Sequence, residues 1–309
     1  MKERFTLLMA IAVKRLPPAV GTQDLSETKV VTCGNIIETS NFKHLNHKCY
    51  CVKLDKNHYY LKKKPCNFDT GELEAIEYNH NENRFESYYS LLKSFKKLRD
   101  IINTNVTDIN KVHWVTLTYA ENMQDLKKLH FDFKHFWNRF KSYSKTNIGL
   151  IPEYISAVEP QERGAWHIHL LILWETKAPF IPHDDIWKMW SPKGYKNNKD
   201  FVKIQSLYKD GKAIDNVGAY LTSYLTDTIS EDEHKKQKHN RLKLYPNGMN
   251  LYRTSKNIQR PKIEYMYESE ARKKVSSAKL TFEKRILIED KDKQYSNEIV
   301  YKYYNSISE

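Results

Sequence analysis

The feature that most constrains the fold is an almost uninterrupted apolar run near the middle of the chain, Trp166–Trp174 (WHIHLLILW). Its length and its Ile, Leu and Trp content are typical of a largely buried strand. Only His167 and His169 break the apolar character. Because side chains two apart in a strand point to the same face, the run predicts two imidazoles side by side.

Strand-like and helix-like segments surround this run. Segments rich in β-branched and aromatic residues, which we expect to be strands, are Val112–Tyr119, Tyr154–Glu159 and Phe201–Leu207. Segments with apolar residues at helical spacing, which we expect to be helices, are 85–104, 126–140 and Asp215–Asp227. Residues 1–84 carry short alternating segments that indicate small β structure with loops. The mixture predicts an α+β fold, with helices packed on an antiparallel sheet.

Length and charge bound the class of protein. A chain of 309 residues with 40% hydrophobic content can bury a real core, and its formal net charge of +13 favours a polyanionic partner such as nucleic acid. The 21 tyrosines suit base stacking as well as a core. No apolar run approaches a membrane span, and we interpret Phe5–Val13 as a strand or helix of the mature protein rather than a signal peptide. We therefore expect a cytoplasmic protein without a membrane partner.

The cysteines cluster in the first quarter of the chain, at Cys33, Cys49, Cys51 and Cys66. Without a secretion signal, a disulfide framework is not expected. His44 and His47 lie nearby, so a Zn²⁺ site is one hypothesis. The alternative is a set of ordinary buried thiols, because Cys-x-Cys is not the usual spacing of paired zinc ligands.

The histidine pair becomes a metal-site candidate if a third ligand joins it. Two neutral imidazoles can bind one divalent ion. Glu159 ends the preceding strand, and a hairpin turn would bring its carboxylate to the same face. Glu162 in the turn and His113 in an earlier strand are alternative ligands. The competing interpretation is a solvent-facing pair, His167 and His169, on a half-buried strand.

Two phenols lie in the last predicted helix of this region. Tyr220 and Tyr224 are four residues apart, which places them one turn apart on the same helix face. Phenols are poor nucleophiles at neutral pH, but a nearby metal can polarise a phosphate that they attack. Gly218 gives room for close approach of another chain. The competing interpretation is an aromatic stripe in a core beside Val217 and Leu221.

Three blocks, in this order and spacing, resemble the HUH endonucleases, specifically the rolling-circle replication initiators (Rep proteins) of small plasmids and phages. The blocks are Trp114–Tyr119 (WVTLTY), Glu159–His169 (EPQERGAWHIH) and Val217–Thr226 (VGAYLTSYLT). Downstream, Tyr252–Lys256 (YRTSK) followed by Pro261 is similar to an element found after the tyrosine helix of these initiators. The resemblance covers roughly residues 112–262.

The resemblance implies a ferredoxin-like (RRM-like) palm with a central antiparallel sheet, and accessory segments at both ends of the chain. It implies that His167, His169 and Glu159 hold Mg²⁺ or Mn²⁺. A tyrosine would attack a phosphate of single-stranded origin DNA. The products would be a 5′-phosphotyrosine link and a free 3′-OH that primes polymerase.

The tyrosine helix departs from the family pattern at one position. Ser223 stands where many relatives carry a lysine before the second tyrosine, and Asp227 stands where another basic residue often follows. We favour Tyr220 as the tyrosine that cuts first, with Tyr224 as the alternative.

The segment Lys235–Lys262 contains nine Lys or Arg residues and no acid, which predicts contact with DNA rather than a merely solvated loop. Bases would stack on Tyr245 or Tyr252. The residues expected to bind DNA are Arg163, Lys243, Tyr252, Arg253 and Lys256. The sequence has no Gly-x-x-x-x-Gly-Lys-Ser/Thr loop, so a host helicase would act beside the host polymerase.

These predictions divide the chain into three parts. Residues 1–105 form an accessory region that binds DNA or zinc, 106–230 the HUH nuclease domain, and 231–309 a basic region that contacts DNA. The expected function is origin-specific nicking and strand transfer that starts rolling-circle replication. Alternatives are a relaxase or transposase with the same chemistry, or a DNA-binding relative that has lost catalysis, which the serine at position 223 would favour.

Overall fold

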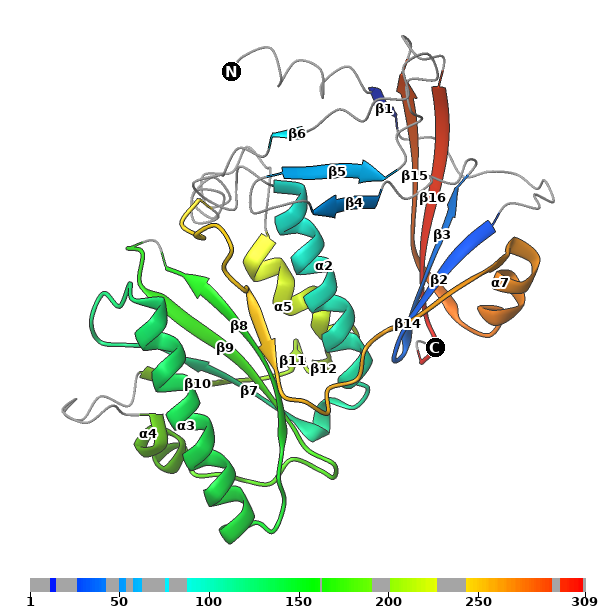
Figure 1. Cartoon of the computed structure of the whole chain (residues 1–309). Helices are drawn as coiled ribbons and strands as arrows, with labels where there is room; N and C mark the ends of the chain where they lie inside the picture. The colour runs from blue at the N-terminus through cyan, green and yellow to red at the C-terminus, as the bar shows by residue number, and fades with distance from the viewer. Residues whose placement is uncertain are drawn as a thin grey trace.

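The computed structural model describes residues 12–14, 27–42, 50–53, 58–62, 76–77, 88–161, 163–190, 201–226, 243–290 and 295–307. These parts form an α+β fold in which each strand pairing is antiparallel, as the sequence predicts (Figure 1). None of the helices in these ranges is long and apolar enough to cross a membrane.

A five-stranded sheet forms the centre of the first half of the fold. In spatial order its strands are β10 (Val202–Gln205), β7 (Val112–Leu117), β9 (Trp166–Leu173), β8 (Glu153–Pro160) and β13 (Tyr252–Thr254). The apolar run forms β9, in the middle of the sheet, because a strand covered on both faces needs apolar side chains on both. The sequence predicts four of these strands; the fifth, β13, lies in the basic stretch.

Helices cover both faces of this sheet (Figure 1). The helices of one face are α3 (Leu126–Asn147) and α4 (His183–Trp190). The helices of the other face are α2 (Tyr88–Asn105) and α5 (Val217–Thr226).

Aromatic contacts identify the two faces. Phe133 and Trp137 of α3 pack on Tyr154, with ring centroids 5.2 and 4.7 Å apart. Tyr220 of α5 packs edge-on against Trp114 at 5.7 Å. Tyr154 and Trp114 pair with consecutive residues of β9, so they point to opposite faces of the sheet.

The core of this half extends beyond residues 106–230. It includes Leu98 and Ile102 of α2 on one side, and Tyr245 and Leu251 on the other. The limits at 105 and 230 therefore do not mark edges of the core, and the division into three functional parts stays a prediction.

A second, six-stranded sheet combines both ends of the chain. In spatial order its strands are β1 (Ala12–Lys14), β15 (Lys279–Asp290), β16 (Tyr295–Asn305), β3 (Ile36–Phe42), β2 (Glu27–Cys33) and β14 (Lys262–Tyr267). Helix α7 (Glu268–Lys274) follows β14. The smaller elements are β4 (Tyr50–Lys53), β5 (His58–Lys62), β6 (Ile76–Glu77), η2 (Ile109–Lys111), β11 (Tyr208–Lys209) and β12 (Lys212–Ala213).

The cysteine region is described in part. Cys33 is a free, buried thiol in β2, and burial, with the nearby negative charges of Asp100 and Glu38, raises its pKa to about 12. It is therefore a neutral thiol rather than the thiolate that zinc binds. The other predicted ligands lie outside the described residues or have undescribed side chains, so the Zn²⁺ site stays a prediction; they are Cys49, Cys51, Cys66, His44 and His47.

Candidate active site

The β8–β9 hairpin brings the predicted metal ligands together. Glu159 is the direct cross-strand partner of His167, and His169 lies opposite Ala157, whose small side chain leaves space beside the carboxylate. Gly164 closes the turn with a φ of 82°, a backbone conformation that favours glycine. The register therefore places one carboxylate and two imidazoles on one face.

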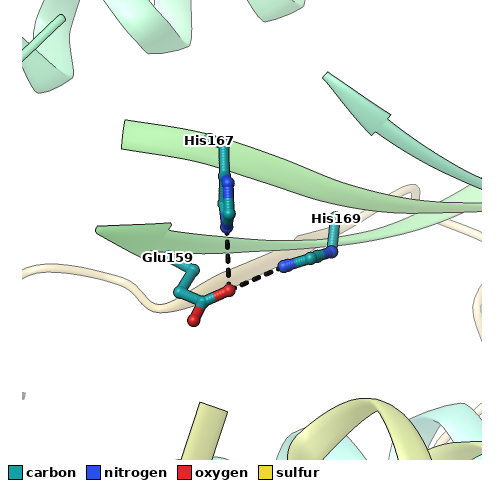
Figure 2. Close-up of side chains that lie close together, drawn as sticks. All are labelled: Glu159, His167 and His169. Atoms are coloured by element: carbon teal, nitrogen blue, oxygen red, sulfur yellow. Dashed lines mark hydrogen bonds and ion pairs between the residues drawn. The ribbon is translucent and has the colours of Figure 1, made fainter. Parts of the chain in front are cut away.

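The three side chains converge on a single oxygen (Figure 2). Oε2 of Glu159 lies 2.8 Å from Nε2 of His167 and 2.8 Å from Nε2 of His169. Burial alone would raise the pKa of Glu159, but the hydrogen bonds from the two histidines lower it to about 2. The carboxylate is therefore ionised at neutral pH, the form that binds a cation.

This geometry fits a divalent ion. One ligand atom from each of the three residues lies within 4.8 Å of the others. Two ligands about 2.1 Å from an ion, at right angles to each other, are about 3.0 Å apart, close to the two observed separations. Two imidazoles with one carboxylate form a donor set for a divalent ion, and they leave further coordination positions for substrate or water.

The alternative ligands do not join this cluster. His113 lies on the opposite face of the sheet, where Nδ1 accepts a hydrogen bond from Nε1 of Trp174 at 3.1 Å. Burial lowers its pKa, so it is a neutral side chain of that interface. Glu162 lies outside the described residues.

A polar chain behind His169 fixes the orientation of its ring. The hydroxyl of Thr116, its cross-strand partner, donates a hydrogen bond to Oε1 of Gln205 at 2.6 Å. Because the hydroxyl proton is used there, the Thr116 oxygen accepts from Nδ1 of His169, 3.3 Å away. This tautomer leaves the Nε2 lone pair for a metal. The sequence analysis missed both residues, although alternation in the WVTLTY block places Thr116 on one face with Trp114.

A second polar chain leads from His167 to the surface. Nε2 of Gln161 lies 3.4 Å from Nδ1 of His167, and Oε1 of Gln161 accepts from Nε of Arg163 at 3.1 Å. Arg163 is exposed. The predicted DNA-binding guanidinium therefore lies two hydrogen bonds from a metal ligand, at the edge of the site.

Helix α5 packs on the same face as the histidines. The Trp114 ring lies between them, with its centroid 6.2 Å from that of His169 and 5.7 Å from that of Tyr220. Tyr220 is partly buried, and Tyr224 follows one turn later in α5 with an undescribed side chain. Ser223, at the position of the family lysine, donates a hydrogen bond to the Tyr220 carbonyl at 2.7 Å.

Gly218 allows α5 to approach α2 of the same chain. Its N–H donates to Oδ1 of Asn103 at 2.9 Å. A Cβ added at this position would lie 2.5 Å from the carbonyl oxygen of Arg99. The room that the sequence analysis assigned to another chain is therefore filled from within the fold, and it sets the position of Tyr220.

The predicted DNA-binding residues are distributed over several surfaces. Tyr252 pairs with Ala157 and shares the face of His169, whereas Arg253 follows it on the opposite face. Lys243 and Lys256 are exposed on either side of β13. Arg163 is the member of this set that hydrogen bonds connect to the histidine cluster, through Gln161.

The stacking role predicted for Tyr245 is wrong. Its side chain is 1% exposed, and its hydroxyl donates to the Val158 carbonyl at 3.0 Å. Its ring packs on Trp166 and Phe95. Tyr245 is a core residue that connects β8, β9 and α2, so it has no free ring face for a base.

Residues 112–229 match the model of a family of replication-associated proteins, described by its ORF2 members. The matched segment contains β7, the β8–β9 hairpin and α5, and it covers less than half of the chain. This match supports a Rep-type replication initiator with a role in DNA replication. No curated protein and no solved structure shows a significant match to the chain.

Proposed function

We propose that this protein starts rolling-circle replication of a plasmid or phage by nicking one strand of origin DNA and transferring it through a 5′-phosphotyrosine link. The observation that carries the proposal is the Glu159–His167–His169 cluster on the sheet face that also holds Tyr220. The family match over residues 112–229 supports it. The five-stranded sheet with its helices would be the ferredoxin-like palm of an HUH nickase.

Each residue has a defined part in the proposed reaction. Glu159, His167 and His169 would hold Mg²⁺ or Mn²⁺, which supplies polarisation of the scissile phosphate and stabilisation of its developing charge. The phenol oxygen of Tyr220 attacks phosphorus, and the bond to the 3′-oxygen breaks. The phenol proton ends, directly or through water, on that oxygen, which leaves a free 3′-OH.

This exchange replaces one phosphodiester with another, so it needs no nucleotide hydrolysis and it can run in reverse. A second phenol at Tyr224 would let the protein cut again at termination while the first link persists. Arg163, at the edge of the histidine cluster, would bind a phosphate of the single strand. The host would supply helicase and polymerase.

The test is to trap the covalent product on single-stranded origin DNA and identify the modified tyrosine by mass spectrometry. We expect an adduct in Mg²⁺ or Mn²⁺ that EDTA abolishes. Tyr220→Phe combined with Tyr224→Phe should eliminate it, and His167→Ala combined with His169→Ala should eliminate its metal dependence. Tyr208→Phe, in the exposed β11–β12 hairpin, is the matched control. An adduct that survives the double tyrosine variant would refute the mechanism.

One observation favours a second candidate, a DNA-binding relative without cleavage activity. Ser223 replaces the family lysine, and its hydroxyl is engaged with the Tyr220 carbonyl. Binding of origin DNA without any adduct, in both Mg²⁺ and Mn²⁺, would support this candidate. Cleavage at transfer-origin or transposon-end DNA instead of a replication origin would identify a relaxase or transposase with the same chemistry.

A further inference from the structure

The second sheet presents a set of side chains that the proposed cleavage chemistry does not use. Cross-strand pairing aligns one residue from each of β14, β2, β3, β16 and β15 on one face: Tyr265, Lys29, Ser40, Tyr301 and Lys284. We call this set the aromatic–basic row. None of the five is acidic, none is buried, and Tyr265 is 49% exposed. Two phenol rings and two ammonium groups therefore interleave along an accessible line.

Apolar rings and neutralised charge flank the aromatic–basic row. In the neighbouring row, Ile263 is 54% and Phe282 is 47% exposed. The acid of that row, Glu38, is buried and paired with Lys96 at 2.6 Å and Arg99 at 2.5 Å. Tyr267, two residues beyond Tyr265 on the same face of β14, is 60% exposed. The surroundings thus add stacking surface without adding an uncompensated negative charge from Glu38.

The chain connects this face directly to the catalytic sheet. The segment 255–261 joins β13, at the edge of the five-stranded sheet, to β14. The basic residues of this passage, Arg253, Lys256, Arg260 and Lys262, are exposed, and no acid occurs from residue 243 to 262. A polyanion that leaves the palm would therefore meet positive charge along the connection.

The chemistry of the aromatic–basic row selects single-stranded DNA. Exposed phenols stack on any unpaired base, whereas the bases of a duplex are stacked on one another and closed to them. Lysines between the rings meet the backbone phosphates. Four gaps of about 4.8 Å between neighbouring strands give the row a length of about 19 Å, enough for several nucleotides.

We propose that this face of the second sheet is a sequence-tolerant binding platform for single-stranded DNA, separate from the metal cluster. Its ligand class rests on the proposed function, because a nickase in rolling-circle replication acts on exposed single strands. The platform would hold the strand next to the one that Tyr220 cuts.

The test measures binding separately from cleavage. The full-length protein is titrated into a fluorescein-labelled 20-mer of dT in EDTA, and fluorescence anisotropy gives Kd. Tyr265→Ala should weaken binding by about fivefold to 150-fold, the range for loss of one stacked base. Tyr265→Phe keeps the ring and should bind within about twofold of the original protein. Lys29→Gln combined with Lys284→Gln should reduce the salt slope of log Kd by about 1.4.

Controls separate the platform from general effects. Phe180→Ala removes a ring that is 90% exposed outside this sheet, and it should leave Kd unchanged. An unchanged Kd for Tyr265→Ala and for the lysine pair would overturn the proposal. So would a variant that changes only the mass measured by light scattering, because the face would then be a contact between copies. If the platform variants weaken binding while no tyrosine adduct forms, the platform stands and the proposed nicking fails.

Discussion

At the scale of single residues, Thr116 decides which nitrogen of His169 faces the metal position. Its oxygen lies between Nδ1 of His169 at 3.3 Å and Oε1 of Gln205 at 2.6 Å. Thr116→Val keeps the shape of the side chain and removes the acceptor for Nδ1. We expect it to weaken Mn²⁺ binding about 10- to 100-fold, the usual cost of losing such a partner, as measured by electron paramagnetic resonance titration.

Two variants test this explanation. Thr116→Ser keeps the hydroxyl and should retain most of the Mn²⁺ affinity. Thr118→Val removes a hydroxyl that donates to the Phe201 carbonyl, so it should not change the affinity. Equal Mn²⁺ affinity in Thr116→Val and the original protein would show that the hydrogen bond to Nδ1 plays no part.

The sequence predicts the metal cluster well but not its supports. Glu159 and the two histidines follow from strand alternation and a short hairpin, both local patterns. The partnership of Thr116 with Gln205 joins residues 89 apart in the chain and depends on the pairing of β10 with β7. Periodicity does not contain that information, so it also misassigned Tyr245, whose ring is covered by elements distant in sequence.

At the scale of elements, the packing of α5 on α2 positions the tyrosine. Gly218→Ala would place a Cβ 2.5 Å from the Arg99 carbonyl and the same distance from Oδ1 of Asn103. Backbone does not yield easily, so α5 must shift away from α2. We expect a loss of about 1–3 kcal/mol in the free energy of unfolding, the cost of overpacking, measured by urea denaturation. Adduct formation by Tyr220 should fall with it.

Ser223→Ala is the control on the same helix. It removes one hydrogen bond to the Tyr220 carbonyl within α5 and no contact with α2. We expect a change in stability of less than about 0.5 kcal/mol, as for a site without special packing. If Gly218→Ala were as stable as Ser223→Ala, the close approach of the two helices would not constrain the fold.

Element prediction from sequence follows the strength of the local pattern. The expected strand Trp166–Trp174 and helix Asp215–Asp227 agree with β9 and α5 to within one or two residues at each end. Strand β13 has only three residues, and tertiary contacts define it: Ser255, just after it, accepts from the Tyr154 N–H at 2.8 Å. A basic stretch with no periodicity does not predict such a strand.

At the scale of the whole molecule, the two chain ends close one sheet. Residues 27–33 pair with 262–267, and residues 36–42 pair with 299–305. Pairing over more than 220 residues leaves no local signature, so the sequence predicts two separate accessory regions where the structure has one sheet. The aromatic–basic row exists only because of this closure, since its residues come from both ends of the chain.

A buried charge network connects this sheet to the palm. Glu38 of β3 accepts from Lys96 and Arg99 of α2, and the Arg99 guanidinium lies 5.3 Å from the ring centroid of Tyr303 in β16. Asp100 pairs with the same two cations. Because Glu38 is nearly inaccessible, removing it leaves two cations with one carboxylate where two had served.

Glu38→Ala should therefore lower the free energy of unfolding by about 3 kcal/mol. This is the low end for a broken buried pair, because the Arg99 and Lys96 side chains keep 23% and 43% exposure. Glu268→Ala breaks a pair with Arg272, whose side chain is 61% exposed, and should cost less than about 1 kcal/mol.

Two optical probes distinguish loss of the connection from general destabilisation. All six tryptophans lie between residues 114 and 190, so tryptophan fluorescence follows the five-stranded sheet and its helices, whereas far-ultraviolet circular dichroism follows both sheets. In the original protein we expect both signals to change at the same urea concentration, because the network makes unfolding cooperative. In Glu38→Ala the dichroism should begin to change at lower urea than the fluorescence. Coincident transitions in that variant would mean that apolar packing around α2, rather than the charge network, holds the two sheets together.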